Sequence, residues 1–271
     1  MLHKNRRHIR PIAVAVGLGL AACLPTPSAP PAAAVTPTGL TVVIMPGLGG
    51  HATDYTSLRD VLTARGYDVK VYELPNLGYA NAGWFAPTAS ISQVLTPHFT
   101  NWVAQQVPTG NLALVAHSAG GLVARDYVKR TGGARVTKLI MAGVANYGTV
   151  VLSGGNDYEV GSPFLAGLNS GDVSVGTVGY WSFTTVWDMV VAPYENQLLP
   201  RASGTRDINV TIPYVPHEVA GVLPDPQVTN VVIQNQCPTS SVGHIGMTKN
   251  ATVQSGIIQA LAGSRNITLP C

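Results

Sequence analysis

The sequence predicts one α/β domain with a mostly parallel central sheet and helices on both faces. Two observations support this fold class: short apolar runs alternate with segments of helical periodicity, and polar residues suited to catalysis follow several of the runs. Alternating strands and helices favour a parallel sheet, and 271 residues suffice for a single core. The predicted strands are Leu40–Met45, Tyr67–Leu74, Leu112–Val115, Val136–Val144, Tyr180–Trp187 and Thr229–Gln236.

Helical spacing of apolar residues fills most of the intervals between these strands. The expected helices cover Asp54–Arg65, Ile91–Val107, the residues after Ser118, Pro163–Leu168 and a last helix around Val253, Ile257 and Leu261 that ends at Gly263. The segment 145–179 is rich in Gly, Ser and Asn and is expected to form a substrate-binding wall or a small lid. Trp84, Phe85 and Trp181 are expected to line a pocket or simply to pack on the surface.

Charge is concentrated at the N-terminus. Four of the 16 basic residues, Lys4, Arg6, Arg7 and Arg10, lie in the first ten positions, which leaves 12 basic against 13 acidic residues, a net charge of −1. The remainder has no basic patch, so the sequence argues against nucleic-acid binding.

An apolar run, Ile12–Cys23, follows these cations, and the combination is typical of an export signal. Residues 1–23 are therefore interpreted as a signal peptide, 24–39 as a Pro/Ala-rich tether and 40–271 as the folded domain. Two maturation routes stay open. Leu20–Cys23 resembles a lipoprotein signal in which Cys23 is lipidated and holds the protein on a membrane; cleavage near Ala32–Ala34 would release it as a secreted protein.

Cysteine usage agrees with export. Once Cys23 is removed or lipidated, Cys237 and Cys271 remain as an even pair in an oxidising compartment. We expect a disulfide between them that pins the C-terminus to the end of the last strand.

A strand–serine–helix pattern surrounds Ser118. The apolar run Leu112–Val115 precedes the serine, a helical pattern follows it, and the residues two before and two after, Ala116 and Gly120, are small. Small residues at these positions allow strand and helix to pass closely in a nucleophile elbow. The competing interpretation is a buried strand followed by an N-capping serine.

A serine nucleophile needs a base and a carboxylate that orients the base. Asp188 and His244 each come just after a predicted strand, and the order Ser118, Asp188, His244 is that of α/β-hydrolases. His217 is the rival base, and Asp207 and Asp225 are rival acids, whereas His117 is expected to pack or to hydrogen-bond locally.

An oxyanion developing at the substrate carbonyl needs backbone N–H donors. Ala119 follows the nucleophile, and Leu48 lies in the glycine-rich turn Pro46–Gly50 after the first strand. Both positions fall at the carboxyl edge of the predicted sheet, where ligands of such sheets bind. This turn lacks the pattern of a phosphate-binding loop.

Five motifs in consistent order resemble the small bacterial lipases of the α/β-hydrolase superfamily, the class 2 lipase group and especially its actinobacterial members. They span most of residues 40–263: Val42–Gly50, Ala116–Gly121, Ser162–Asn169, Trp187–Pro193 and Gly243–Gly246. The resemblance implies an α/β-hydrolase fold with minimal or no lid, the triad Ser118, Asp188 and His244, and the oxyanion donors Leu48 and Ala119. Two features depart from the group: Pro46 stands where many members have His, and the connection Gln197–Gln227 is extended.

The same resemblance implies a carboxylester hydrolase, a lipase or esterase acting on acylglycerols at a lipid–water interface, without metal or cofactor and as a monomer. A thioesterase, polyester depolymerase or acyltransferase could use the same residues. An inactive hydrolase fold that carries lipid is the alternative outside the enzymes.

Overall fold

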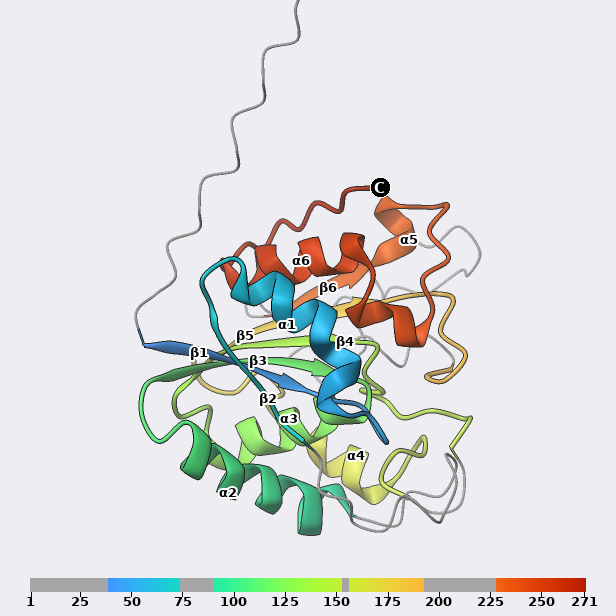
Figure 1. The fold of residues 1–271 in the computed structure, drawn as a ribbon. Helices are drawn as coiled ribbons and strands as arrows, with labels where there is room; N and C mark the ends of the chain where they lie inside the picture. Colours follow the sequence, from blue (N-terminus) through green and yellow to red (C-terminus); the bar gives the residue numbers. More distant parts are fainter. Residues whose placement is uncertain (1–38, 74–89, 153–155, 193–227) are drawn as a thin grey trace, which may run out of the picture. The chain divides into compact units, whose positions relative to one another are not determined.

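A computed structural model of the protein describes residues 39–73, 90–152, 156–192 and 228–271 (Figure 1). Its centre is a six-stranded sheet, all of whose neighbouring strands run parallel, in the order β2-β1-β3-β4-β5-β6. The strands are β1 Leu40–Met45, β2 Asp68–Val71, β3 Asn111–His117, β4 Val136–Ala142, β5 Gly179–Thr184 and β6 Val228–Val232. The predicted signal peptide with Cys23 and residues 24–38 of the tether lie outside the described residues.

Helices cover both faces of the sheet. In the view of Figure 1, α1 and α6 lie above it and α2, α3 and α4 below. The helical elements are α1 Thr56–Thr63, α2 Thr96–Gln106, α3 Ala119–Thr131, α4 Pro163–Leu168, α5 Ile233–Gln236, α6 Ala251–Leu261, the 3₁₀ segments η1 Ala52–Tyr55 and η5 His244–Thr248, and the π-helical segment η3 Ile91–Leu95. In the described part of the chain, no helix is both long and apolar enough to cross a membrane.

Two apolar layers, one on each face of the sheet, explain why β1 is buried along its whole length. Successive side chains of a strand point to opposite faces of the sheet. Val43 of β1 therefore packs in the core between the sheet and helices α2 and α3, whereas Val42 packs in the core between the sheet and helices α1 and α6. All six residues of β1 are buried. A strand covered on both faces has no position for an exposed polar side chain, as expected for a parallel sheet.

The last two strands are shorter than predicted. β6 ends at Val232, which pairs with the end of β5 at Thr184. Beyond this pair neither strand has a partner, and Ile233–Gln236 turn into the short helix α5. Cys237 therefore follows a helix and not the end of a strand, which corrects the expected attachment point.

Trp181 is not a surface or pocket residue. It lies on β5, is only 2% exposed and packs in the core beneath α6. Its indole N–H donates to the carbonyl of Ser264, and the guanidinium of Arg265 lies 4.6 Å from the ring centre. Trp84 and Phe85 lie outside the described residues.

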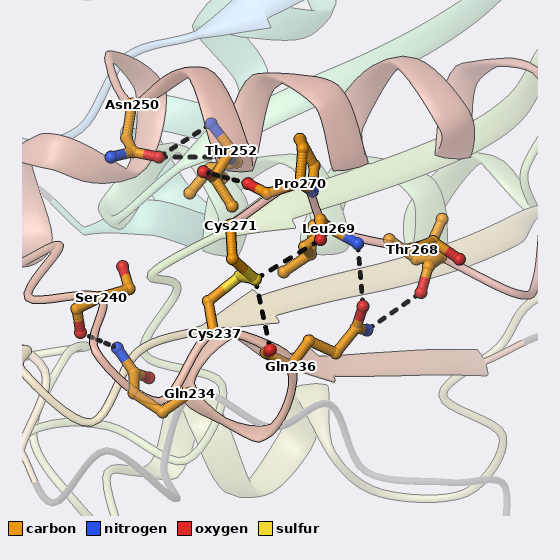
Figure 2. The surroundings of a disulfide bond; sticks show 12 residues. Gln234, Gln236, Cys237, Ser240, Asn250, Thr252, Thr268, Leu269, Pro270 and Cys271 are labelled. Carbon is orange, nitrogen blue, oxygen red and sulfur yellow. Dashed lines mark hydrogen bonds between the residues drawn. A yellow bond between two sulfur atoms is a disulfide. The ribbon is translucent and has the colours of Figure 1, made fainter. Parts of the chain in front are cut away.

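The end of the chain is fastened beside α6 (Figure 2). A disulfide joins Cys237 to Cys271. The Gln236 side chain donates to the carbonyl of Ile267 at 2.9 Å and accepts from the N–H of Leu269 at 2.8 Å. Thr252 at the start of α6 donates to the carbonyl of Pro270 at 2.7 Å. The last residues are thus held to both α5 and α6.

The disulfide joins cysteines 34 positions apart in the sequence and should stabilise the domain mainly by restricting the unfolded chain. Replacing both cysteines by serine is expected to lower the free energy of unfolding by about 2–4 kcal/mol. Urea unfolding of the double variant and of the oxidised and reduced parent protein measures this difference. An unchanged midpoint after reduction would contradict the prediction.

Candidate active site

The loops after the strands bring the predicted site residues to one edge of the sheet. Pro46–Gly50 follows β1, Ser118 follows β3, and Asp188 lies in a turn beyond β5. His244 begins η5, after β6 and α5. Parallel strands end at a common edge, so residues far apart in the sequence meet there.

Ser118 occupies a strained turn between β3 and α3. Its φ and ψ are 52° and −129°, and only it and Arg135 have positive φ among the described non-glycine residues. A Cβ on Gly120 would overlap the carbonyl oxygens of Met45 and Pro46, and one on Gly121 would overlap the Val144 side chain. Glycine at position 120 lets α3 begin against the end of β1, and glycine at position 121 lets it pass the segment after β4, with the serine at the tip of the turn.

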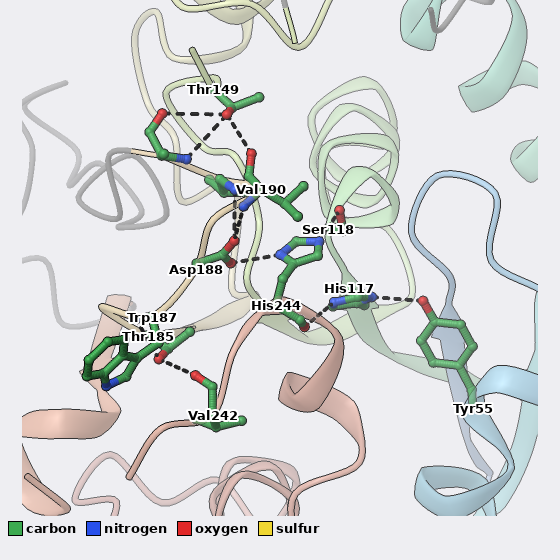
Figure 3. Close-up of polar contacts among 12 residues, drawn as sticks. Tyr55, His117, Ser118, Thr149, Thr185, Trp187, Asp188, Val190, Val242 and His244 are labelled. Atoms are coloured by element: carbon green, nitrogen blue, oxygen red, sulfur yellow. Dashed lines mark hydrogen bonds and ion pairs between the residues drawn. The ribbon is translucent and has the colours of Figure 1, made fainter. Parts of the chain in front are cut away.

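A hydrogen-bonded series connects Ser118, His244 and Asp188 (Figure 3). The Nε2 atom of His244 lies 2.9 Å from Ser118 Oγ, and its Nδ1 lies 2.7 Å from Asp188 Oδ2. Since an ionised carboxylate only accepts, Nδ1 carries the proton and Nε2 of the neutral ring is free to accept from the serine. This is the geometry that a serine nucleophile, its base and an orienting acid require.

The carboxylate of Asp188 is fixed at both oxygens. Its Oδ1 accepts from the N–H groups of Val190 and Val191, each at 2.8 Å. Thr149 holds the same loop from outside by donating to the carbonyl of Val190 at 2.6 Å, as Figure 3 shows. Thr185, at the start of the turn, donates to the carbonyl of Val242 at 2.6 Å and so ties the Asp188 loop to the segment before His244.

The three rival residues cannot be compared with the triad residues, and two further histidines lie within the described part of the chain. His217, Asp207 and Asp225 lie outside the described residues. His98 pairs with the hydroxyl of Tyr72 at 2.8 Å, away from the serine. His51 lies on the wall of the cavity around Ser118 but is absent from the hydrogen-bonded series.

The backbone N–H groups of Leu48 and Ala119, beside Ser118, have no acceptor within the described structure. Both residues line the same cavity as the serine. The turn that carries Leu48 is closed by a bond from the N–H of Gly50 to the carbonyl of Gly47 at 3.0 Å. A Cβ on Gly47 would come within 2.8 Å of the serine Cβ, so only glycine permits this close approach.

His117 packs in the interior, which is one of the two expectations from sequence, but its hydrogen bonds are long-range and not local. Its Nδ1 lies 2.8 Å from the hydroxyl of Tyr55, and its Nε2 lies 3.0 Å from the carbonyl oxygen of His244. Burial, with a smaller contribution from nearby His244, lowers the pKa of His117 to about 3. The imidazole is therefore neutral at physiological pH. No pattern in the sequence indicates these long-range partners.

A cavity of about 680 Å³ opens around Ser118. One part of its wall is apolar and comes from Val151, Leu152, Met189, Val190 and Val191, and another part is polar and includes His51, Asp54 and Lys249. Exposed apolar side chains continue from the wall to the surface, with Met189 84% exposed and Ile245 52% exposed. Within the described ranges, no cluster of three His, Cys, Asp or Glu side chains could hold a metal ion.

The neutral, buried state of His117 predicts a loss of stability in acid. The pKa of His117 is about 3 in the folded chain against 6.5 for the free side chain, so between these values the unfolded chain binds the extra proton. The free energy of unfolding should therefore fall as the pH drops from about 6.5 toward 3, by at most about 1.4 kcal/mol per pH unit from this group. Denaturant titrations between pH 7 and pH 4 measure the slope.

His117→Gln removes the titrating ring and should decline less steeply over the same range, although it starts from a lower stability at pH 7. The exposed His51→Gln variant is the control and should keep the slope of the parent protein. Equal slopes for His117→Gln and the parent would contradict the assignment.

The chain is similar to one protein family and to several solved structures. Residues 36–151 match the family model described as "Serine aminopeptidase, S33", which covers less than half of the chain. No curated protein matches the sequence. Among solved structures, the chain is similar to Aspergillus fumigatus lipase B, with a TM-score of 0.58 and 16% identity over 86% of this chain and 54% of that one. The chain thus spans about half the length of that lipase.

A second similar structure is MGS-MChE2, an α/β-hydrolase enzyme from the metagenome of sediments of the Mar Chica lagoon in Morocco. The two share 15% identity, with a TM-score of 0.52 over 83% of this chain and 90% of that chain. The parallel sheet, the helices on both its faces and these two similarities show that the chain has the α/β-hydrolase fold.

Proposed function

We propose that this protein is a serine carboxylester hydrolase, a lipase or esterase that cleaves acylglycerols or similar lipid esters. The observation that carries the proposal is the hydrogen-bonded series Ser118–His244–Asp188 in a partly apolar cavity, next to two backbone N–H groups without an acceptor in the described structure. Each part of this arrangement corresponds to one requirement of acyl transfer.

Acylation begins at Ser118. Its Oγ attacks the ester carbonyl carbon while His244 Nε2, 2.9 Å away, takes the hydroxyl proton. The imidazolium that forms is stabilised by Asp188, whose Oδ2 accepts from Nδ1 at 2.7 Å. The N–H groups of Leu48 and Ala119 donate to the oxyanion, whose charge develops only during the reaction.

The intermediate then collapses. His244 gives its proton to the departing alkoxide, and an acyl group remains on Ser118. A water molecule, deprotonated by the same Nε2, releases the acid by the reverse sequence of steps. Because Val190 and Val191 hold the second carboxylate oxygen, Asp188 keeps the ring oriented through both halves of the cycle.

The cavity wall supports a fatty acyl substrate. Val151, Leu152, Met189, Val190 and Val191 offer apolar contacts, and apolar groups transferred from water gain roughly 25 cal/mol per Å² of buried surface. The similar Aspergillus fumigatus protein is named a lipase, which agrees with this substrate class. The resemblance of the five sequence motifs to small class 2 lipases of actinobacteria favours the same choice.

A serine aminopeptidase is the second candidate, because that is the description of the matched family model. Asp54 lies on the polar part of the cavity wall, where its carboxylate could receive a substrate ammonium. The apolar wall beside it favours the ester over the peptide.

The site of action is also part of the proposal. We propose an exported monomer, either secreted or held at a membrane through a lipidated Cys23, which meets its substrate at a lipid–water interface. The exposed Met189 and Ile245 beside the cavity support contact with such an interface. Mass spectrometry of the mature protein would separate lipidation at Cys23 from cleavage near Ala32–Ala34.

Substitution of Ser118 tests the proposed nucleophile. The parent protein should hydrolyse p-nitrophenyl esters from acetate to palmitate, and Ser118→Ala should lower kcat by at least about 10⁴-fold, because the substitution removes the attacking oxygen. Stopped and continuous assays of both proteins, with aminoacyl p-nitroanilides as a parallel substrate series, measure this.

Ser170→Ala, a change at an exposed serine after α4, is the control and should retain full activity. A folded parent protein that cleaves no ester would refute the proposal, and turnover restricted to the aminoacyl anilides would favour the peptidase. Acyl transfer to an added alcohol in preference to water would indicate an acyltransferase.

Substitution of Val151 tests whether the apolar wall of the cavity binds the acyl chain. Val151→Asn should reduce kcat/KM for decanoate at least about 10-fold relative to acetate, because only the longer chain reaches the substituted wall and a polar group there remains partly desolvated. The ratio of the two specificity constants is the measured quantity.

Val94→Asn is the matched control, since Val94 is 37% exposed and Val151 is 36% exposed but Val94 lies on η3 outside the cavity wall. A decanoate-to-acetate ratio that is the same in Val151→Asn and Val94→Asn would place the acyl chain elsewhere.

A further inference from the structure

A chain of hydrogen bonds with a fixed direction runs beneath the site. The N–H of Gly47 lies 2.7 Å from the Tyr55 hydroxyl, the hydroxyl lies 2.8 Å from Nδ1 of His117, and Nε2 of His117 lies 3.0 Å from the carbonyl oxygen of His244. Figure 3 shows His117 between Tyr55 and the backbone of His244. The chain therefore joins the glycine turn, η1, the end of β3 and η5.

Each donor in this chain follows from its neighbours. The carbonyl of His244 can only accept, so Nε2 of His117 carries the ring proton. The neutral ring then accepts at Nδ1, and the hydroxyl of Tyr55 must donate to it. The N–H of Gly47 can only donate, so it uses a lone pair of the same hydroxyl. The three bonds thus have one consistent arrangement of protons.

Burial makes this arrangement strong. Tyr55 is 4% exposed and His117 is 5% exposed, so water competes little for their polar atoms. Burial also raises the pKa of the Tyr55 hydroxyl and lowers that of the His117 imidazole. Both groups therefore stay uncharged, and His117 does not compete with His244 for the proton of the serine although the two rings are only 4.7 Å apart.

The position of the first bond links the chain to catalysis. Gly47 is the residue before Leu48, whose N–H has no acceptor within the described structure. Fixing the N–H of Gly47 on Tyr55 limits rotation of the turn just before the Leu48 peptide. The last bond fixes the carbonyl of His244, the residue whose side chain serves as the base. One chain of hydrogen bonds thus holds one oxyanion donor and the base relative to the nucleophile.

We propose that Tyr55 and His117 are positioning residues that hold the Leu48 N–H and the His244 backbone in the geometry of the tetrahedral intermediate. This inference rests on the proposed ester hydrolysis, whose residues it does not change. Neither side chain needs to touch the reacting atoms. Their effect is expected in the transition state and not in the binding of the substrate, because the oxyanion appears only during the reaction.

Tyr55→Phe tests the proposal with the smallest change. It keeps the ring and removes both bonds of the hydroxyl, so kcat should fall about 10- to 100-fold with KM within about twofold of the parent value. Complete loss of an oxyanion donor costs about 10²–10³-fold, and a displaced donor should cost less. The affinity for an alkyl boronic acid, which forms a tetrahedral adduct on the serine, should fall by the same factor as kcat.

Two substitutions of His117 separate the ends of the chain. The amide of Asn reaches the place of Nδ1 and that of Gln the place of Nε2. His117→Gln should therefore lose only the bond to Tyr55 and fall less in kcat than Tyr55→Phe, which also loses the bond to Gly47. The double variant should be no worse than Tyr55→Phe, because that variant already lacks the bond between the two side chains. His117→Asn should retain the Tyr55 contact and lose the bond to His244, with a shift in the pH profile of kcat/KM that Tyr55→Phe does not show.

A matched control and a binding assay separate failure of the positioning role from failure of the proposed ester hydrolysis. Tyr72→Phe is the control, since it removes a buried tyrosine hydroxyl bonded to His98 away from the site and should leave kcat and boronate affinity unchanged. Unchanged kcat and boronate affinity in Tyr55→Phe, or equal loss in Tyr72→Phe, would overturn the inference. If the parent protein turned over no ester, the proposed function would fail, and boronate affinity with the ¹⁵N NMR tautomer of His117 would still decide the inference.

Discussion

The parallel pairing of the six strands is the constraint on which the rest of the structure depends. Because β1, β3, β5 and β6 all end at the same edge, the glycine turn, Ser118, Asp188 and His244 converge without any local sequence relation. The two apolar layers hold the strands in register, and that register fixes the separation of the loops. The chemistry of the site thus depends on a core that takes no part in it.

Much of the fold and the main site residues could be predicted because they depend on local patterns. A β-branched run encodes a strand, and a serine between small residues at the end of such a run encodes a tight turn, so the residues around Ser118 are enough to indicate a nucleophile. Asp188 and His244 follow from their order and their place after strands. The structure brings these three side chains into hydrogen-bond contact.

Other features could not be predicted because they depend on partners distant in the sequence. The end of β6 at Val232 is set by where β5 stops, and no residue in Ile233–Gln236 marks it. His117 is adjacent to the serine in sequence, which suggests local bonding, yet its partners are 62 and 127 positions away. Thr149 holds the Asp188 loop from a segment whose composition predicts a substrate-binding wall or a small lid but no contact with that loop.

The turn at Ser118 has a consequence for how this sequence can change. The backbone of Ser118 has a positive φ, a conformation that glycine adopts freely. A residue with a Cβ adopts it at a cost of about 1–3 kcal/mol. A glycine at this position would relax the turn and at the same time remove the proposed nucleophile. Drift toward greater stability therefore leads away from activity at this residue, so a serine persists there only while its hydroxyl is under selection.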